Sequence, residues 1–113
     1  MALLAMAIPI PPGKTDQWRQ FMEQLRGSRH ADYKASRDRL GVRERAFFQQ
    51  TPHGDLVIVT LEGDDPAQAF MKFAERTDPF TEWFVAQVKE IHNLDLRQPP
   101  PGPLPEMVVD SHG

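Results

Sequence analysis

The apolar positions at the start of the chain do not alternate with polar ones. Residues 2–8 contain no polar side chain at either parity, whereas a strand with one solvated face alternates apolar and polar residues. The pattern therefore predicts a strand over residues 2–8 with both faces covered. Prolines at positions 9, 11 and 12 end it.

A helical period begins near Thr15, which is a suitable N-cap residue. Apolar side chains recur at i, i+3, i+4 and i+7 over residues 18–25, which predicts one buried stripe. The Gly27-Ser28 pair interrupts this period, so the helix either kinks there or restarts with the serine as its cap. A weaker stripe continues over residues 33–40, and Gly41 is the expected left-handed stop.

Two β-rich runs, at residues 42–50 and 56–62, predict a hairpin. Their connector, residues 51–54, has proline second and glycine fourth, as in a type I turn with a glycine bulge. If Thr51 opposes Asp55, the numbers of paired residues sum to 106.

This register places Phe48 opposite Ile58 and Ala46 opposite Thr60, with Glu44 on the same side of the hairpin. We expect that side to be the one that the helices do not cover. A shift of one residue would exchange the two faces, because successive side chains of a strand point in opposite directions.

Two aspartate–proline pairs mark the starts of two further helices. Asp65-Pro66 and Asp78-Pro79 each place an N-cap carboxylate before a proline at the first helical position. Apolar stripes follow both pairs, and Asn93 is a suitable left-handed stop. The pattern predicts a short helix, a bend at Thr77 and a longer helix.

The end of the chain changes composition. Residues 97–105 hold five of the eleven prolines, which predicts an extended proline-rich arm over 99–105. Residues 106–110, EMVVD, follow as a predicted last strand. The complete order is β-α-β-β-α-β in a single α+β domain over residues 1–113, the ferredoxin-like arrangement.

This order, together with the doubly apolar first strand, resembles the dimeric α/β-barrel superfamily. Residues 41–66, 78–96 and 99–110 are similar to runs in small bacterial proteins of unknown function with that fold. The resemblance implies a four-stranded antiparallel sheet with helices on one face. It also implies a homodimer through the other sheet face, so that the two sheets enclose a barrel.

Composition is that of one globular domain: 113 residues, 40% hydrophobic and 26% charged. The absence of cysteine excludes a disulfide framework and a thiolate site. Residues 14–45 carry nine basic against five acidic side chains, and residues 46–113 carry four against eleven. Because acidic residues interrupt the basic segment, we interpret it as a solvated face rather than a nucleic-acid surface.

The apolar start lacks a basic n-region and is half the length of a membrane span. We therefore expect no membrane association and a cytoplasmic location. The four histidines show no metal-binding spacing, and no phosphate-binding or nucleophile motif occurs, so the sequence predicts neither a metal nor a cofactor.

One face of the predicted helix carries three polar side chains at i, i+3 and i+7, namely His30, Tyr33 and Arg37. They either line the mouth of a pocket or form the edge of an amphipathic helix. Glu44 is either a desolvated general base inside the barrel or the partner of a nearby arginine. His92 suits a helix C-terminus or acid–base chemistry. The full set of candidate ligand-binding residues is His30, Tyr33, Arg37, Glu44, Phe48, Thr60, Trp83 and His92.

Three functions remain open at this stage. The first is a small dimeric α/β-barrel protein that binds a small apolar or aromatic ligand in the barrel. The alternative is a cofactor-independent monooxygenase or polyketide-cyclase-like enzyme, and the third is an interaction module that uses the proline arm. A barrel filled by side chains favours the first, whereas an open pocket with a buried Glu44, His30 or Tyr33 favours the second.

Overall fold

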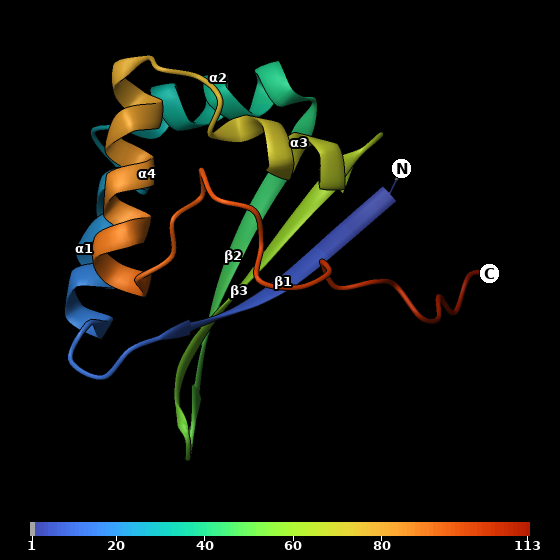
Figure 1. Ribbon diagram of the computed structural model, residues 1–113, viewed down its shortest axis with the longest axis horizontal. Coiled ribbons are helices and arrows are strands. Elements are labelled where there is room, and N and C mark those ends of the chain that lie inside the picture. The colour runs from blue at the N-terminus through green and yellow to red at the C-terminus, as the bar shows by residue number, and fades with distance from the viewer. Residues whose placement is uncertain (1) are drawn as a thin grey trace.

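The computed structural model describes residues 2–113 as one three-stranded antiparallel sheet with four helices (Figure 1). The strands are ordered β1-β3-β2, so β3 is central and β1 and β2 are edges. The elements are β1 (Ala2–Ile10), α1 (Thr15–Arg26), α2 (His30–Leu40), β2 (Val42–Thr51), β3 (Gly54–Gly63), α3 (Pro66–Phe73) and α4 (Pro79–His92).

The four-stranded ferredoxin-like arrangement predicted from the sequence is wrong. Residues 106–110 form no strand, and the chain after the proline-rich arm runs away from the sheet (Figure 1). Prolines have no N–H donor and hold the arm extended, so the arm carries the chain past β1 instead of turning it alongside. The barrel built from two four-stranded sheets is therefore not the architecture of this chain.

The predicted helix boundaries are mostly confirmed. Asp65 accepts a hydrogen bond from the Gln68 amide at 3.1 Å, and Asp78 caps α4 in the same way. Gly41 (φ 71°) and Asn93 (φ 55°) both adopt the left-handed conformation at helix ends. These four residues act locally, which is why the sequence reveals them.

Two predicted caps are wrong. The Thr15 hydroxyl donates to the carboxylate of Asp55 at 2.6 Å instead of capping α1. The second helix restarts at His30, and its N-cap position is Arg29 rather than Ser28. Thr15 instead ties the start of α1 to β3, a contact across forty residues that no local pattern indicates.

The hairpin register differs from the predicted one by one residue. Thr51 pairs with Gly54, so paired numbers sum to 105 and Phe48 lies opposite Val57. The connector is a two-residue loop, which removes the expected bulge. The shift exchanges the faces: Glu44 and Phe48 lie on the helix side, whereas Ile58 and Thr60 lie on the open side.

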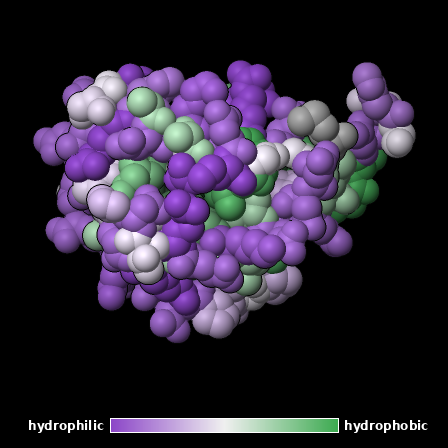
Figure 2. All heavy atoms as spheres, turned by 90° about the horizontal axis from the view of Figure 1, so that it is seen from above, coloured by the Kyte–Doolittle hydropathy of each residue, from purple (hydrophilic) through white to green (hydrophobic). Residues whose placement is uncertain are grey.

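The core lies between the helices and one face of the sheet. Its larger cluster joins α1 and α4 to the sheet through side chains such as Phe21, Phe84 and Ile91, and a smaller cluster lies under α3 around Leu4 and Leu61. Hydrophilic side chains cover most of the face seen in Figure 2, with apolar patches between them. No helix within residues 2–113 is long and apolar enough to cross a membrane.

The other sheet face carries an apolar row and no helix. Ala7, Ile58 and Phe47 are neighbours across the three strands and all point to this side. Phe47 is 53% exposed and Leu3 is 42% exposed. The face is therefore uncovered in the single chain.

Candidate functional site

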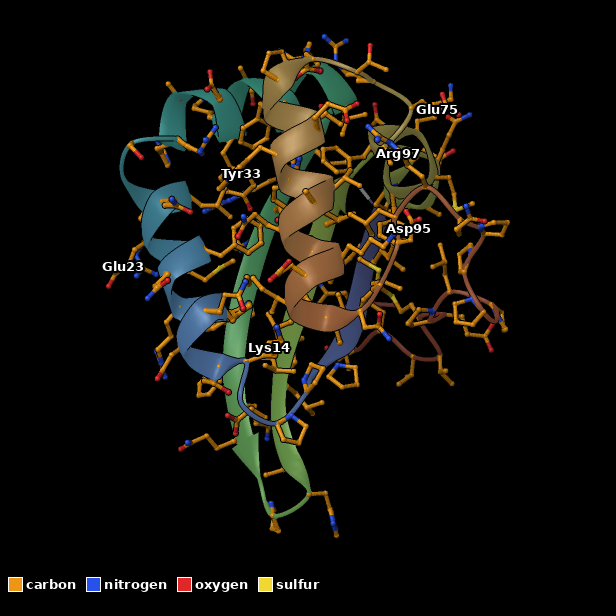
Figure 3. All side chains as sticks on the ribbon, turned by 60° about the vertical axis from the view of Figure 1, so that its left-hand side comes forward. Lys14, Glu23, Tyr33, Glu75, Asp95 and Arg97 are labelled. Atoms are coloured by element: carbon orange, nitrogen blue, oxygen red, sulfur yellow. The ribbon has the colours of Figure 1, made fainter. Side chains whose placement is uncertain are left out.

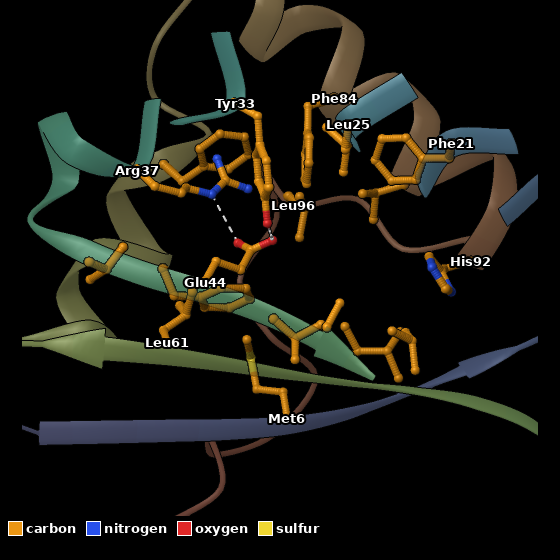
Figure 4. Close-up of a pocket in the computed structure, with 18 of the residues that line it drawn as sticks. Met6, Phe21, Leu25, Tyr33, Arg37, Glu44, Leu61, Phe84, His92 and Leu96 are labelled. Atoms are coloured by element: carbon orange, nitrogen blue, oxygen red, sulfur yellow. Dashed lines mark hydrogen bonds and ion pairs between the residues drawn. The ribbon is translucent and has the colours of Figure 1, made fainter. Parts of the chain in front are cut away.

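Two side chains of α2 converge on one carboxylate of β2 (Figure 4). The Tyr33 hydroxyl donates to Oε2 of Glu44 at 2.6 Å, and Arg37 Nε donates to Oε1 at 2.9 Å. Tyr33 and Arg37 are four residues apart and so share one helix face. The left-handed Gly41 ends α2 and starts β2, which brings Glu44 back beneath that face.

The guanidinium of Arg37 is enclosed by aromatic rings. Its carbon lies 4.9 Å from the ring centre of Tyr33, 4.5 Å from that of Phe73 and 4.7 Å from that of Phe84. Nη1 also donates to the Ser36 hydroxyl at 2.9 Å. Ring faces attract cations more strongly where water is excluded, so the charge of Arg37 is held in place by its rings as well as by its carboxylate.

The Tyr33 hydroxyl stays protonated. Burial raises the pKa of Tyr33 well above its ordinary value, and the neighbouring negative charge of Glu44 raises it further. The phenol is therefore a hydrogen-bond donor to Glu44 and not a base. Figure 3 shows Tyr33 pointing inward from its helix.

A cavity of about 90 Å³ lies beside this polar cluster, between the helices and the sheet. Most side chains around it are apolar, and Glu44, Tyr33 and Arg37 form a polar group in its wall (Figure 4). Ala46 also lines the cavity and pairs with the inward-facing Val59, yet it is exposed. The cavity therefore reaches the surface beside Ala46, at the β2 edge.

His92, at the end of α4, also lines the cavity. Its Nδ1 lies 2.9 Å from the carbonyl oxygen of Pro9. Because a carbonyl only accepts, Nδ1 carries the hydrogen and Nε2 keeps a free lone pair when the ring is neutral. Burial lowers the pKa of His92, which outweighs the opposite effect of that hydrogen bond and favours the neutral ring.

Four of the predicted site residues share this cavity: Tyr33, Arg37, Glu44 and His92. Glu44 is confirmed as the partner of an arginine, but its predicted place inside a barrel is wrong because the register puts it under the helices.

The other four predicted residues lie elsewhere. His30 is exposed, Thr60 points to the open sheet face, and Phe48 stacks on Trp18 at 5.3 Å without lining the cavity. Trp83 packs on Phe21. The guanidinium of Arg29 also lies 3.9 Å from the Trp83 ring centre.

Sequence reasoning missed the ring enclosure of Arg37 in the site and one further contact outside the site. Phe73 and Phe84 form the ring enclosure of Arg37, and the only signal for them was the high aromatic content of the second helix pair. Arg97 was also missed. It donates to both carboxylate oxygens of Glu82 and to the carbonyl oxygen of Ala74, and so fixes the start of the proline-rich arm beside α3 (Figure 3).

No protein-family model, curated protein or solved structure matches the chain. The resemblance to the dimeric α/β-barrel superfamily therefore stays a prediction, and the function proposed below rests on the geometry of the cavity and its side chains. Within residues 2–113, histidine, aspartate and glutamate side chains form no group of three that could hold a metal ion.

Proposed function

We propose that the protein binds a small, largely apolar or aromatic ligand that carries a hydroxyl or similar donor group, in the cavity between the helices and the sheet. The observation that supports this most is the Glu44 carboxylate, held by Tyr33 and Arg37, in the wall of a largely apolar cavity. Ligand sites commonly combine an apolar lining with a few convergent polar groups.

The carboxylate has capacity left for a ligand. A carboxylate offers about four lone-pair positions, and within the chain Glu44 uses two of them, for Tyr33 and Arg37. A ligand hydroxyl that donates to a third lone-pair position of Glu44 would make a charge-assisted hydrogen bond. Such bonds are strong in a site of low polarity. The same site disfavours a ligand carboxylate, which Glu44 repels.

The volume of the cavity limits how much of the ligand it can enclose. An enclosed space of about 150 Å³ holds benzene, so the 90 Å³ here holds the hydroxylated end of a ring or short chain. The remainder of the ligand lies in the opening beside Ala46. Aromatic rings such as Phe21 and Phe84 give this space the lining that suits an aromatic ligand.

The test compares phenol with toluene, which have the same number of heavy atoms, by titration calorimetry. Phenol should bind at least tenfold more tightly, because one hydrogen bond to a charged group contributes about 1.5–3 kcal/mol. Ala46→Trp should abolish phenol binding, whereas Ala86→Trp, at an exposed position of α4, should leave it intact. Equal affinity for the two compounds would contradict the proposal.

A second candidate function, the cofactor-independent monooxygenase or polyketide-cyclase-like enzyme, is favoured by His92. His92 lines the cavity, and Nε2 of its neutral ring keeps a lone pair that is suited to accept a proton from an acidic C–H or O–H group of the ligand. The measurement is protein-dependent hydrogen–deuterium exchange at the carbon next to the carbonyl group of a bound phenolic ketone. His92→Gln should abolish that exchange without preventing binding, and unchanged exchange would exclude this function.

The open sheet face supports a homodimer. The row Ala7, Ile58 and Phe47 continues into apolar residues of β1 on the same face, and exposed apolar patches of this kind commonly mark interaction sites. A second copy presents the same apolar face, as a two-fold interface requires. An ordinary specific interface covers about 800 Å² per partner.

A further inference from the structure

The segment of residues 106–110, called the C-terminal segment below, exposes three apolar side chains. Met107 is 54% exposed, Val108 is 85% exposed and Val109 is 84% exposed. Figure 1 shows the chain extended here and clear of the helices and sheet. Neighbouring apolar residues in an extended backbone, two of them β-branched, favour strand pairing.

The free edge of β1 is suited to pair with such an extended apolar segment. β1 is nine residues long and contains no charged side chain, and within the described part of the chain it pairs only with β3. Proteins usually protect such an edge with charges, because its unpaired backbone groups bind other extended chains. The opposite edge strand, β2, carries Arg43, Glu44 and Arg45.

A hollow of about 760 Å³ lies beside the middle part of this edge. Met6, Ala7 and Ile8 all line it, although successive strand residues point to opposite faces, so the hollow lies beside the strand and not over one face. Residues of α3 and the proline-rich arm bound its other sides.

We propose that the C-terminal segment of one copy docks in the hollow along the β1 edge of a second copy, and that the exchange is reciprocal. The C-terminal segment does not fold back onto the β1 edge of its own chain. Leu104, just before it, is packed on the cluster around Leu4, and the sequence has no glycine between Pro105 and Val109 at which the chain could turn back. Reciprocal docking produces a closed two-fold dimer. This contact is separate from the open sheet face and from the ligand site.

The test uses the full chain. Light scattering should show a dimer, and hydrogen exchange should show slow amides at Met107, Val108 and Val109 that become fast on dilution to the monomer. Val108→Lys with Val109→Lys should weaken dimerisation at least tenfold. The control, Ser111→Lys with His112→Lys, adds the same charge just beyond the segment and should not.

The outcomes separate the two interfaces. A dimer whose three amides exchange fast at every concentration overturns the docking of the segment and leaves the sheet-face dimer intact. Slow amides in a monomer overturn it as well, because the segment then docks on its own chain. A monomer with fast amides at tens of micromolar overturns both contacts.

Discussion

Arg37 and Glu44 form a buried ion pair, with Nε and Oε1 2.9 Å apart and side chains only 8% and 12% exposed. Such a pair is costly to break because the remaining charge stays buried without a partner. The pair joins α2 to β2 and also holds the one carboxylate that residues 2–113 contribute to the cavity lining, so it contributes to the fold and to the proposed binding site.

We expect Glu44→Gln and Arg37→Met each to lower the free energy of unfolding by about 3–5 kcal/mol. The double variant Arg37→Met/Glu44→Gln should cost much less than the sum of the two, because it leaves no unpaired charge. Urea denaturation of the four proteins gives the interaction energy. Strictly additive losses would show that the two charges do not depend on each other.

Alkaline pH should destabilise the protein through Tyr33, the only tyrosine in the chain. Its folded pKa lies above the unfolded value near 10, so its contribution is complete below pH 10 and is lost as pH rises above it. Tyr33→Phe should lose less stability between pH 9 and pH 11. In the native protein, phenolate absorbance should appear only with unfolding, and a reversible rise near pH 10 would contradict the buried hydrogen bond.

Asp78→Ala should cost about 0.5–2 kcal/mol, because it removes the cap of α4. Burial alone raises the pKa of Asp78, but hydrogen bonds from Thr81 and Arg76 lower it to about 2. The stabilisation is therefore present above the ordinary value of 3.8 and disappears as pH falls through about 2. Denaturant melts provide the measurement, with Glu90→Ala on the same helix as the control of equal charge.

Ile58→Asp should weaken dimerisation by removing the contact through the open sheet face. The substitution places a carboxylate in the middle of the apolar row of the open sheet face, where a second copy would have to bury it. Gln50→Asp, near the hairpin loop and outside that row, is the matched control. Light scattering at equal concentration distinguishes the two, and an unchanged dimer in Ile58→Asp would exclude this face.

The sequence predicted the features that depend on neighbouring residues. Asp65, Asp78, Gly41 and Asn93 each act within a few residues of their own position, and all four were identified correctly. The hairpin register depends on loop geometry. Two loop residues instead of three were enough to move Glu44 to the other face.

Long-range contacts could not be predicted. The bond between Thr15 and Asp55 and the ring enclosure of Arg37 join segments that share no local pattern. The predicted fourth strand failed for a related reason. Residues 106–110 have the composition of a strand, but whether a strand forms depends on a neighbouring edge, which this chain does not bring alongside.

The central claim is that Glu44 receives a ligand donor group inside the cavity. A crystal structure of the protein with phenol tests it most directly. We expect the phenol oxygen within about 2.5–3.0 Å of a Glu44 carboxylate oxygen, the range of an O–H···O bond, with its ring directed toward Ala46. A cavity closed by neighbouring side chains, with phenol bound only at the surface, would contradict the account.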